Sequence, residues 1–250
     1  MKKSHTSVKS CFINTPKNLF KSIMALEESK ILENYFDEIA PNYELMNSLL
    51  SLNLDKIWRQ RLLKETLKNH PIKVLDIACG TCDILRLFLS KQSGLEIFGL
   101  DLSFGMLNQG KLRDKKLNLI RGNGIHTPFS DDCFDAITIA FGFRNMPNYL
   151  DFLIEAKRIL RPNGKLTILE LTQPQNPLLR IGNTIYLKSV LPFISSFFGK
   201  NQEAYDYLAR SIQAFPNQKE VLNLFSQAKF SKSSYSLNQF GITTQFVGIK

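Results

Sequence analysis

Two cysteines lie three positions apart in the segment 77–83, whose sequence is Ile-Ala-Cys-Gly-Thr-Cys-Asp. Cysteines at this spacing can form a redox dithiol, supply half of a zinc site, or belong to a turn that binds a nucleotide. The other cysteines and the three histidines form no second ligand pair, so we expect no metal site. The carboxylates of Asp76 and Asp83 would raise the pKa of a neighbouring thiol, which disfavours redox chemistry. A nucleotide-binding turn accounts for the most residues.

The acidic residues around this turn indicate which nucleotide it could bind. Asp76 ends one apolar run, and Asp101 ends another about 20 residues after the turn, where a carboxylate can accept both ribose hydroxyls. Gly80 permits a tight turn between a strand and a helix. A dinucleotide would need Gly-x-Gly-x-x-Gly at this place, but the chain has Asp83, which repels phosphate and attracts a sulfonium. The pattern favours S-adenosylmethionine (SAM), with helix capping as the alternative role of Asp76 and Asp83.

Alternating strands and helices must position these residues. The predicted strands are 73–78, 96–100, 117–120, 134–140 and 165–171, and the predicted helices between them are 83–91, 103–113 and 149–160. Near-continuous apolar strands that alternate with helices indicate a parallel sheet covered on both faces. In such a sheet the ligand lies beyond the carboxyl ends of the strands, where both acidic residues fall.

The flanking segments complete the predicted fold. Residues 33–70 have helical spacing that Pro41 interrupts, 217–230 form an amphipathic helix, and the last 19 residues are typical of an antiparallel hairpin. The fold class is therefore α/β, with a doubly wound, mostly parallel seven-stranded sheet, an antiparallel C-terminal hairpin and a helical cap. We expect one domain over 27–250 with a helical insertion at about 173–215, after a basic extension over 1–26.

Composition and charge limit the remaining choices. The chain has 250 residues and a net charge of +10, and the first 26 residues contain five lysines and no acidic residue. This extension is a disordered tail, a membrane-surface anchor or a mitochondrial presequence. No apolar run is long enough to span a membrane, and four scattered cysteines favour an intracellular compartment. Without a basic helix or an aromatic stripe, we expect no nucleic acid partner.

Five segments together resemble a known enzyme family. VLDIACGTCD, at residues 74–83, resembles the first motif of class I SAM-dependent methyltransferases. Four further segments, at 36–59, 141–146, 158–174 and 205–218, resemble the ubiquinone/menaquinone biosynthesis C-methyltransferase family. The first motif is common to many methyltransferases, whereas the other four together are specific to this family. The resemblance covers nearly everything from about residue 33 onward.

The resemblance implies a SAM site made of Asp76, Gly80, Thr81, Asp83, Asp101, Asn123 and Gly124. Thr81 and Asp101 would contact SAM directly, and Asn123 and Gly124 would lie beside the adenine. Cys82 departs from the family, which usually has glycine there. If this position needs a positive φ, the side chain costs on the order of 1–3 kcal/mol and could weaken SAM binding.

The implied reaction is C-methylation of a polyprenylated quinol ring, either demethylmenaquinol or 2-methoxy-6-polyprenyl-1,4-benzoquinol, and either branch remains open. Arg144 and Asn145 would form the site that stabilises the ring oxyanion, with Arg144 as a charge stabiliser rather than a base. A structural salt bridge is the alternative role of Arg144. The base would be water or a carboxylate that the sequence does not identify.

A polyprenyl quinol is soluble in lipid, so we expect a cytoplasmic protein that associates peripherally with a membrane surface. The apolar segment 185–198 and the N-terminal helices fit a greasy substrate or ordinary core. A homodimer is one state that the sequence leaves open. Two rival functions also stay open: a noncatalytic assembly subunit with the same fold, and a methyltransferase for another small aromatic or lipid acceptor.

Overall fold

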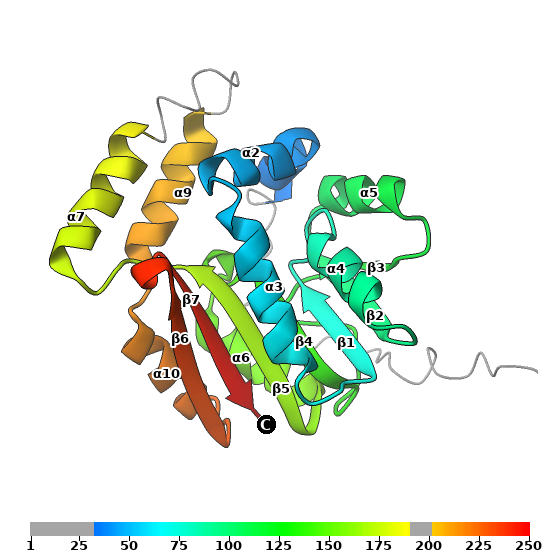
Figure 1. Ribbon diagram of the computed structural model, residues 1–250. Coiled ribbons are helices and arrows are strands. Elements are labelled where there is room, and N and C mark those ends of the chain that lie inside the picture. The colour runs from blue at the N-terminus through cyan, green and yellow to red at the C-terminus, as the bar shows by residue number, and fades with distance from the viewer. Residues whose placement is uncertain (1–32, 191–201) are drawn as a thin grey trace, which may run out of the picture.

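The computed structural model describes residues 33–190 and 202–250 (Figure 1). The predicted basic extension at 1–26 lies outside the described residues, as does the middle of the predicted insertion. The described parts of that insertion are helical: α7 (Pro177–Ile185), a π-helical turn at Tyr186–Val190, and α9 (Gln202–Ala214).

A seven-stranded sheet forms the centre of the molecule (Figure 1). Its strands are β1 (Lys73–Ile77), β2 (Glu96–Asp101), β3 (Asn118–Arg121), β4 (Phe134–Ala140), β5 (Leu160–Leu171), β6 (Lys232–Asn238) and β7 (Thr243–Ile249). The strand order is β3-β2-β1-β4-β5-β7-β6, with β1 to β5 parallel and β7 antiparallel between β5 and β6. The predicted fold class is confirmed, including the antiparallel hairpin at the C-terminus.

Helices cover both faces of this sheet. They are α2 (Tyr43–Leu50), α3 (Leu54–Leu67), α4 (Asp83–Lys91), α5 (Phe104–Arg113), α6 (Tyr149–Ile159) and α10 (Gln218–Gln227), besides α7 and α9. The strand β1 is buried throughout: Val74 packs in a cluster with α3 and α4, whereas Leu75 packs in a cluster with α6 and α10. A strand with apolar neighbours on both sides explains why its sequence does not alternate with polar residues.

The N-terminal helices follow the predicted break at Pro41. Residues 33–39 are helical, a short 3-10 turn spans Ala40–Asn42 with the proline in it, and α2 begins at the next residue. Proline lacks the N–H that would continue the first helix, so the chain changes direction there. In Figure 1, α2 lies across the end of the sheet at which the parallel strands finish, beside α9.

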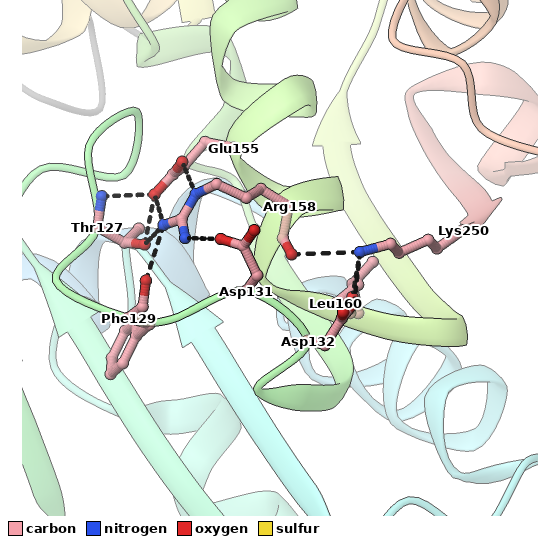
Figure 2. A network of polar contacts seen from close by, with 8 residues as sticks. All are labelled: Thr127, Phe129, Asp131, Asp132, Glu155, Arg158, Leu160 and Lys250. Atoms are coloured by element: carbon pink, nitrogen blue, oxygen red, sulfur yellow. Dashed lines mark hydrogen bonds and ion pairs between the residues drawn. The ribbon is translucent and has the colours of Figure 1, made fainter. Parts of the chain in front are cut away.

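A polar network joins elements at the opposite end of the sheet (Figure 2). The Arg158 guanidinium donates to Glu155 at 2.7 Å, to Asp131 at 2.6 Å and to the Phe129 carbonyl at 2.8 Å. The Lys250 ammonium donates to Asp132 at 2.7 Å and to the Leu160 carbonyl at 2.7 Å. These contacts tie the end of α6 and the last strand to the loop before β4, away from the strand ends that hold the predicted site.

No helix in the described part of the chain has the length and apolar character required to cross a membrane.

Candidate functional site

A cavity lies beyond the carboxyl ends of the parallel strands. We name it the strand-end cavity; its walls include Gly80, Asp101, Asn123, Gly124 and Asn145, which lie at or after the ends of four different strands. Four of these were predicted to bind SAM, and Asn145 was predicted to be catalytic. The doubly wound topology brings them together because parallel strands all present their carboxyl ends at one edge.

Asp101, which was predicted to accept the two ribose hydroxyls, lies in the wall of the strand-end cavity. It accepts hydrogen bonds from the Gly80 N–H at 2.7 Å and from the Ser103 N–H at 2.9 Å, so both of its oxygens are held in place. Burial raises the pKa of Asp101 to about 6, although these backbone hydrogen bonds act in the opposite direction. Each oxygen keeps a second lone pair, which suits a carboxylate that receives two vicinal hydroxyls.

The loop between β1 and α4 alternates between ordinary and left-handed backbone. Ala78, Gly80 and Cys82 have φ values of 52°, 54° and 71°. Glycine adopts this conformation freely, whereas alanine and cysteine are strained in it. The positive φ expected at Cys82 is confirmed. Its side chain is fully buried and does not line the cavity, so it can affect SAM binding only through the backbone of the loop.

Asn123 and Gly124 form the part of the wall that follows β3. The Asn123 side-chain oxygen accepts a hydrogen bond from the Ile125 N–H at 3.1 Å, which fixes the amide group at the cavity wall. A Cβ on Gly124 would lie 2.8 Å from the Cγ2 atom of Ile77. Glycine is therefore needed here for close packing against β1, and the adjacent amide of Asn123 is the group that can recognise an adenine.

Two predicted SAM residues, Asp76 and Thr81, lie behind the cavity wall rather than in it. Asp76 is almost completely buried and accepts a hydrogen bond from the Thr138 hydroxyl at 2.6 Å. Burial raises the pKa of Asp76 to about 7, with the Thr138 hydrogen bond opposing the shift. The Thr81 hydroxyl donates to Glu44 of α2 at 2.7 Å. Both residues support the loop in this structure.

Asp83 also lies outside the cavity wall, and its charge is already matched. The Asp83 carboxylate forms ion pairs with Arg59 of α3 and Arg86 of α4. That Asp83 attracts a sulfonium stays a prediction, and in this structure two guanidinium groups offset its negative charge. Asp83 is the first residue of α4, where a carboxylate interacts favourably with the helix dipole, but Cys82 occupies the N-cap position and no side chain forms a cap hydrogen bond there.

Three carboxylates of the N-terminal helices attach these helices to the end of β3, to α4 and its preceding loop, and to α5, and sequence analysis did not identify them. Glu33 pairs with Arg121 at the end of β3, and Asp37 accepts from the Gly105 N–H at 2.8 Å at the start of α5. Glu44 accepts from Arg86 at 3.1 Å as well as from Thr81. We name residues 33–50 the latched segment. No local pattern predicts these contacts, because the partners are distant in the sequence.

A second cavity adjoins the first. Its walls contain many aromatic residues, namely Tyr35, Phe36, Tyr43, Trp58, Phe141, Tyr186 and Tyr207, and we name it the aromatic cavity. Phe36, Tyr43 and Phe141 line both cavities, so the two spaces share one wall. A polar ligand beside Asp101 and an apolar ligand among the aromatic rings would therefore be neighbours.

Arg144 lines the aromatic cavity, and its guanidinium forms a buried ion pair with Glu170 at 2.8 Å. It also donates to the Phe141 carbonyl, and its backbone N–H donates to Glu170 at 3.0 Å. Burial lowers the pKa of Arg144, but the charge and hydrogen bond of Glu170 act together with Tyr43 and Tyr207 in the opposite direction, and the pKa lies above its usual value. The salt bridge that the sequence left as an alternative is present, and Arg144 stays protonated beside the cavity.

Asn145 connects the two cavities. It lines the strand-end cavity, and its side-chain oxygen accepts a hydrogen bond from the Tyr207 hydroxyl at 3.0 Å. Tyr207 lines the aromatic cavity. The two residues predicted to be catalytic therefore lie at the common wall, Arg144 on one side and Asn145 on the other.

The fold and this site define a class I SAM-dependent methyltransferase. Among solved structures, the chain resembles a SAM-dependent methyltransferase of Thermotoga maritima, described as a possible histamine N-methyltransferase. The TM-score is 0.62 at 17% sequence identity, over 87% of this chain and 99% of the other. It also resembles phosphoethanolamine N-methyltransferase 2 of Haemonchus contortus, with a TM-score of 0.56 at 15% identity, over 77% of this chain and 52% of the other. At these identities the likeness concerns the fold alone.

The chain belongs to the ubiE/COQ5 methyltransferase family, whose model matches residues 23–250. It is similar to demethylmenaquinone methyltransferase of Staphylococcus haemolyticus, at 36% identity over 86% of this chain and 92% of the relative. It is equally similar to that of Bacillus subtilis, at 36% identity over 86% of this chain and 95% of the relative. The resemblance stated from the sequence is confirmed, as are an enzymatic function and SAM as the methyl donor. The noncatalytic alternative is not favoured.

Proposed function

We propose that this enzyme methylates a ring carbon of a polyprenylated quinol, with demethylmenaquinol as the acceptor. The observation that carries the proposal is the shared wall of the two cavities, formed by Phe36, Tyr43 and Phe141. A nucleoside in the strand-end cavity and a flat, apolar ring in the aromatic cavity would meet at this wall. The names of the relatives in staphylococci and bacilli support the same acceptor.

The side chains at the wall suit carbon methylation. SAM supplies an electrophilic methyl group, so the protein has to position the ring and stabilise negative charge on its oxygen. Arg144 offers N–H donors that stay charged, while Glu170 fixes the orientation of the guanidinium. Asn145, held by Tyr207, stands on the SAM side of the same wall. Proximity and oxyanion stabilisation are the contributions that this arrangement can make.

The proposal extends to a membrane surface as the place where the quinol is taken up. The helix α7 has no buried residue, and Leu178, Ile181 and Ile185 are 79%, 58% and 56% exposed. The residues on either side of its C-terminal end, Asn183 and Leu187, line the aromatic cavity. An exposed apolar helix next to an apolar cavity fits a lipid surface that supplies a lipid-soluble substrate, and a net charge of +10 favours anionic lipid.

Competition between two acceptors tests the reaction. The enzyme receives labelled SAM together with demethylmenaquinol and 2-methoxy-6-polyprenyl-1,4-benzoquinol, both reduced and in detergent, and the products are separated by mass. We expect the labelled methyl group in menaquinol. Label in the methylated benzoquinol as well would show that the enzyme also acts in the ubiquinone branch. Label in neither product would contradict the proposal and favour another aromatic or lipid acceptor.

Vesicle sedimentation tests the surface. We expect the wild-type enzyme to sediment with anionic vesicles, and Ile181→Glu in α7 to bind them at least several-fold more weakly. Ile154→Glu is the matched control, because Ile154 is 50% exposed on α6, on another part of the molecule. Equal loss in the two variants, or no binding by the wild-type enzyme, would contradict the membrane proposal.

A further inference from the structure

The proposed reaction needs a proton acceptor beside the aromatic cavity, because a quinol ring carbon becomes nucleophilic when a ring hydroxyl loses its proton. Arg144 keeps its own proton and cannot take another. Glu170 is fully buried, and its carboxylate accepts from both the side chain and the backbone of Arg144. Of the described residues that line the aromatic cavity, Asp55 alone carries a carboxylate.

The local structure leaves one oxygen of Asp55 available. Asp55 lies in the first turn of α3, and the Ser51 hydroxyl donates to its Oδ1 atom at 2.8 Å. Its Oδ2 atom is 3.7 Å from the nearest guanidinium nitrogen of Arg59, which is beyond hydrogen-bonding distance, and that guanidinium pairs closely with Asp83. Within the described residues, Oδ2 therefore has no hydrogen-bond donor besides its longer ionic contact with Arg59, and Asp55 lines the aromatic cavity. An acceptor oxygen without a donor on a residue that lines a cavity is one that a ligand can satisfy.

The packing of α3 puts Asp55 near the wall that the two cavities share. The Arg59 guanidinium lies over the Phe141 ring, 5.7 Å from its centroid, and the Trp58 ring packs edge-on against the same ring. The carbonyl of Phe141 accepts from Arg144. The helix α3, which carries Asp55, therefore packs against the ring of Phe141, and Arg144 contacts the backbone of Phe141. Asp55, Phe141 and Arg144 all line the aromatic cavity.

We propose that Asp55 is the general base of the methyl transfer, an assignment that rests on the proposed function. Asp55 Oδ2 takes the proton of a ring hydroxyl as the oxygen gains negative charge beside Arg144. The ring carbon then forms a bond to the methyl group while the carbon–sulfur bond breaks and its electron pair stays on the sulfur of S-adenosylhomocysteine. The hydrogen on the methylated carbon leaves as a proton to water, the ring oxygen regains a proton from Asp55, and the aromatic quinol is restored.

A purely structural role is the rival for Asp55, because its backbone N–H also donates to the Ser51 hydroxyl at 3.3 Å, which ties the first turn of α3 to the residues before it. Asp55→Asn separates the two roles: an amide oxygen can still accept from Ser51, but the amide cannot take the proton. Ser51→Ala is the matched control, since it removes this contact and keeps the carboxylate. Asp55→Ala with added sodium formate provides a third measurement, because a small carboxylate can enter the vacated space.

We expect Asp55→Asn to lower kcat for demethylmenaquinol by at least about 100-fold. The KM for the quinol, the Kd for S-adenosylhomocysteine and the melting temperature should stay close to wild type. Ser51→Ala should keep kcat within about tenfold, and formate, but not sodium chloride of equal ionic strength, should restore part of the kcat of Asp55→Ala. A wild-type enzyme that methylates demethylmenaquinol together with a fully active Asp55→Asn would overturn this assignment alone. A wild-type enzyme that methylates no quinol would overturn the proposed function and the assignment with it.

Discussion

Substituting Cys82 by alanine and, separately, by glycine would measure the strain in the SAM loop. Cys82 has a φ of 71° and caps the N-terminus of α4, and its side chain is fully buried. A Cβ on Gly110 of α5 would collide with its Sγ atom, so the thiol fills the space between the loop and α5. Backbone strain and side-chain packing therefore oppose each other at this one position.

The two contributions can be estimated separately. Cys82→Ala keeps the left-handed Cβ and loses the buried sulfur, which should destabilise the fold by about 1 kcal/mol. Going on from alanine to glycine removes a buried methyl group worth about 0.8 kcal/mol, costs about 0.5–1 kcal/mol for the flexibility of glycine, and relieves about 1–2 kcal/mol of left-handed strain. The stability of the glycine variant should therefore lie within about 1 kcal/mol of that of the alanine variant.

Urea unfolding of three variants checks this estimate. Ala156→Gly is the control, because Ala156 is also fully buried but has ordinary helical backbone inside α6. It should lose about 1.5 kcal/mol, from one methyl group and the flexibility of glycine. If alanine-to-glycine at position 82 costs as much as at 156, the strain is absent and the reasoning fails. Calorimetry with S-adenosylhomocysteine should give Cys82→Gly an affinity equal to or tighter than that of wild type; a large loss would give the thiol itself a role.

Three further outcomes are expected. The pKa of Asp76 is raised from 3.8 to about 7, so the folded protein binds the extra proton in this range and wild-type stability falls as pH rises. Asp76→Asn should therefore gain a few kcal/mol on wild type between pH 5 and pH 8 in urea unfolding, and an equal difference at both pH values would contradict this. Asp37 attaches the latched segment to α5 through the N–H of Gly105. Gly105→Ala would place a Cβ 2.9 Å from an Asp37 oxygen and disturb this attachment, so it should weaken S-adenosylhomocysteine binding roughly tenfold in calorimetry. Gly182→Ala is the control and should not weaken binding, because the space around Gly182 is open. Arg158→Ala should lose about 2 kcal/mol of stability at the far end of the sheet, and a changed affinity for S-adenosylhomocysteine would show that the two ends are coupled.

Local sequence pattern was sufficient for the fold. The run from 73 to 78 is apolar at four of its six positions without alternating, and β1 is buried at every residue, because helices cover it on both sides. Element boundaries were less certain: β5 begins at Leu160, where the predicted helix was to end, and its first residues pair with β4 across an irregular register. A change from helix to strand at one residue leaves no signal in hydrophobic periodicity.

The site was predictable where backbone topology alone decides its position. Asp101 and Asn123 follow strands of a parallel sheet, and this places them in the cavity wall whatever else surrounds them. Thr81 and Asp83 both belong to the first motif, at 74–83, but their side chains do not face the cavity. Thr81 contacts Glu44, and Asp83 pairs with two arginines. Apart from Arg86, the partners of these two side chains are 24 and 37 residues away, and a single sequence does not reveal such partners.

The contact of Thr81 with Glu44 gives this threonine of the first motif a structural role besides the predicted contact with SAM. The hydroxyl of Thr81 and the guanidinium of Arg86 both donate to Glu44, so α2 is fixed against the loop that holds Gly80. The latched segment also supplies Tyr43 to the wall between the two cavities. A contact that orders this segment therefore shapes the SAM site and the acceptor site together. Binding in one cavity should depend on the other through this shared wall, even though the ligands have separate recognition groups.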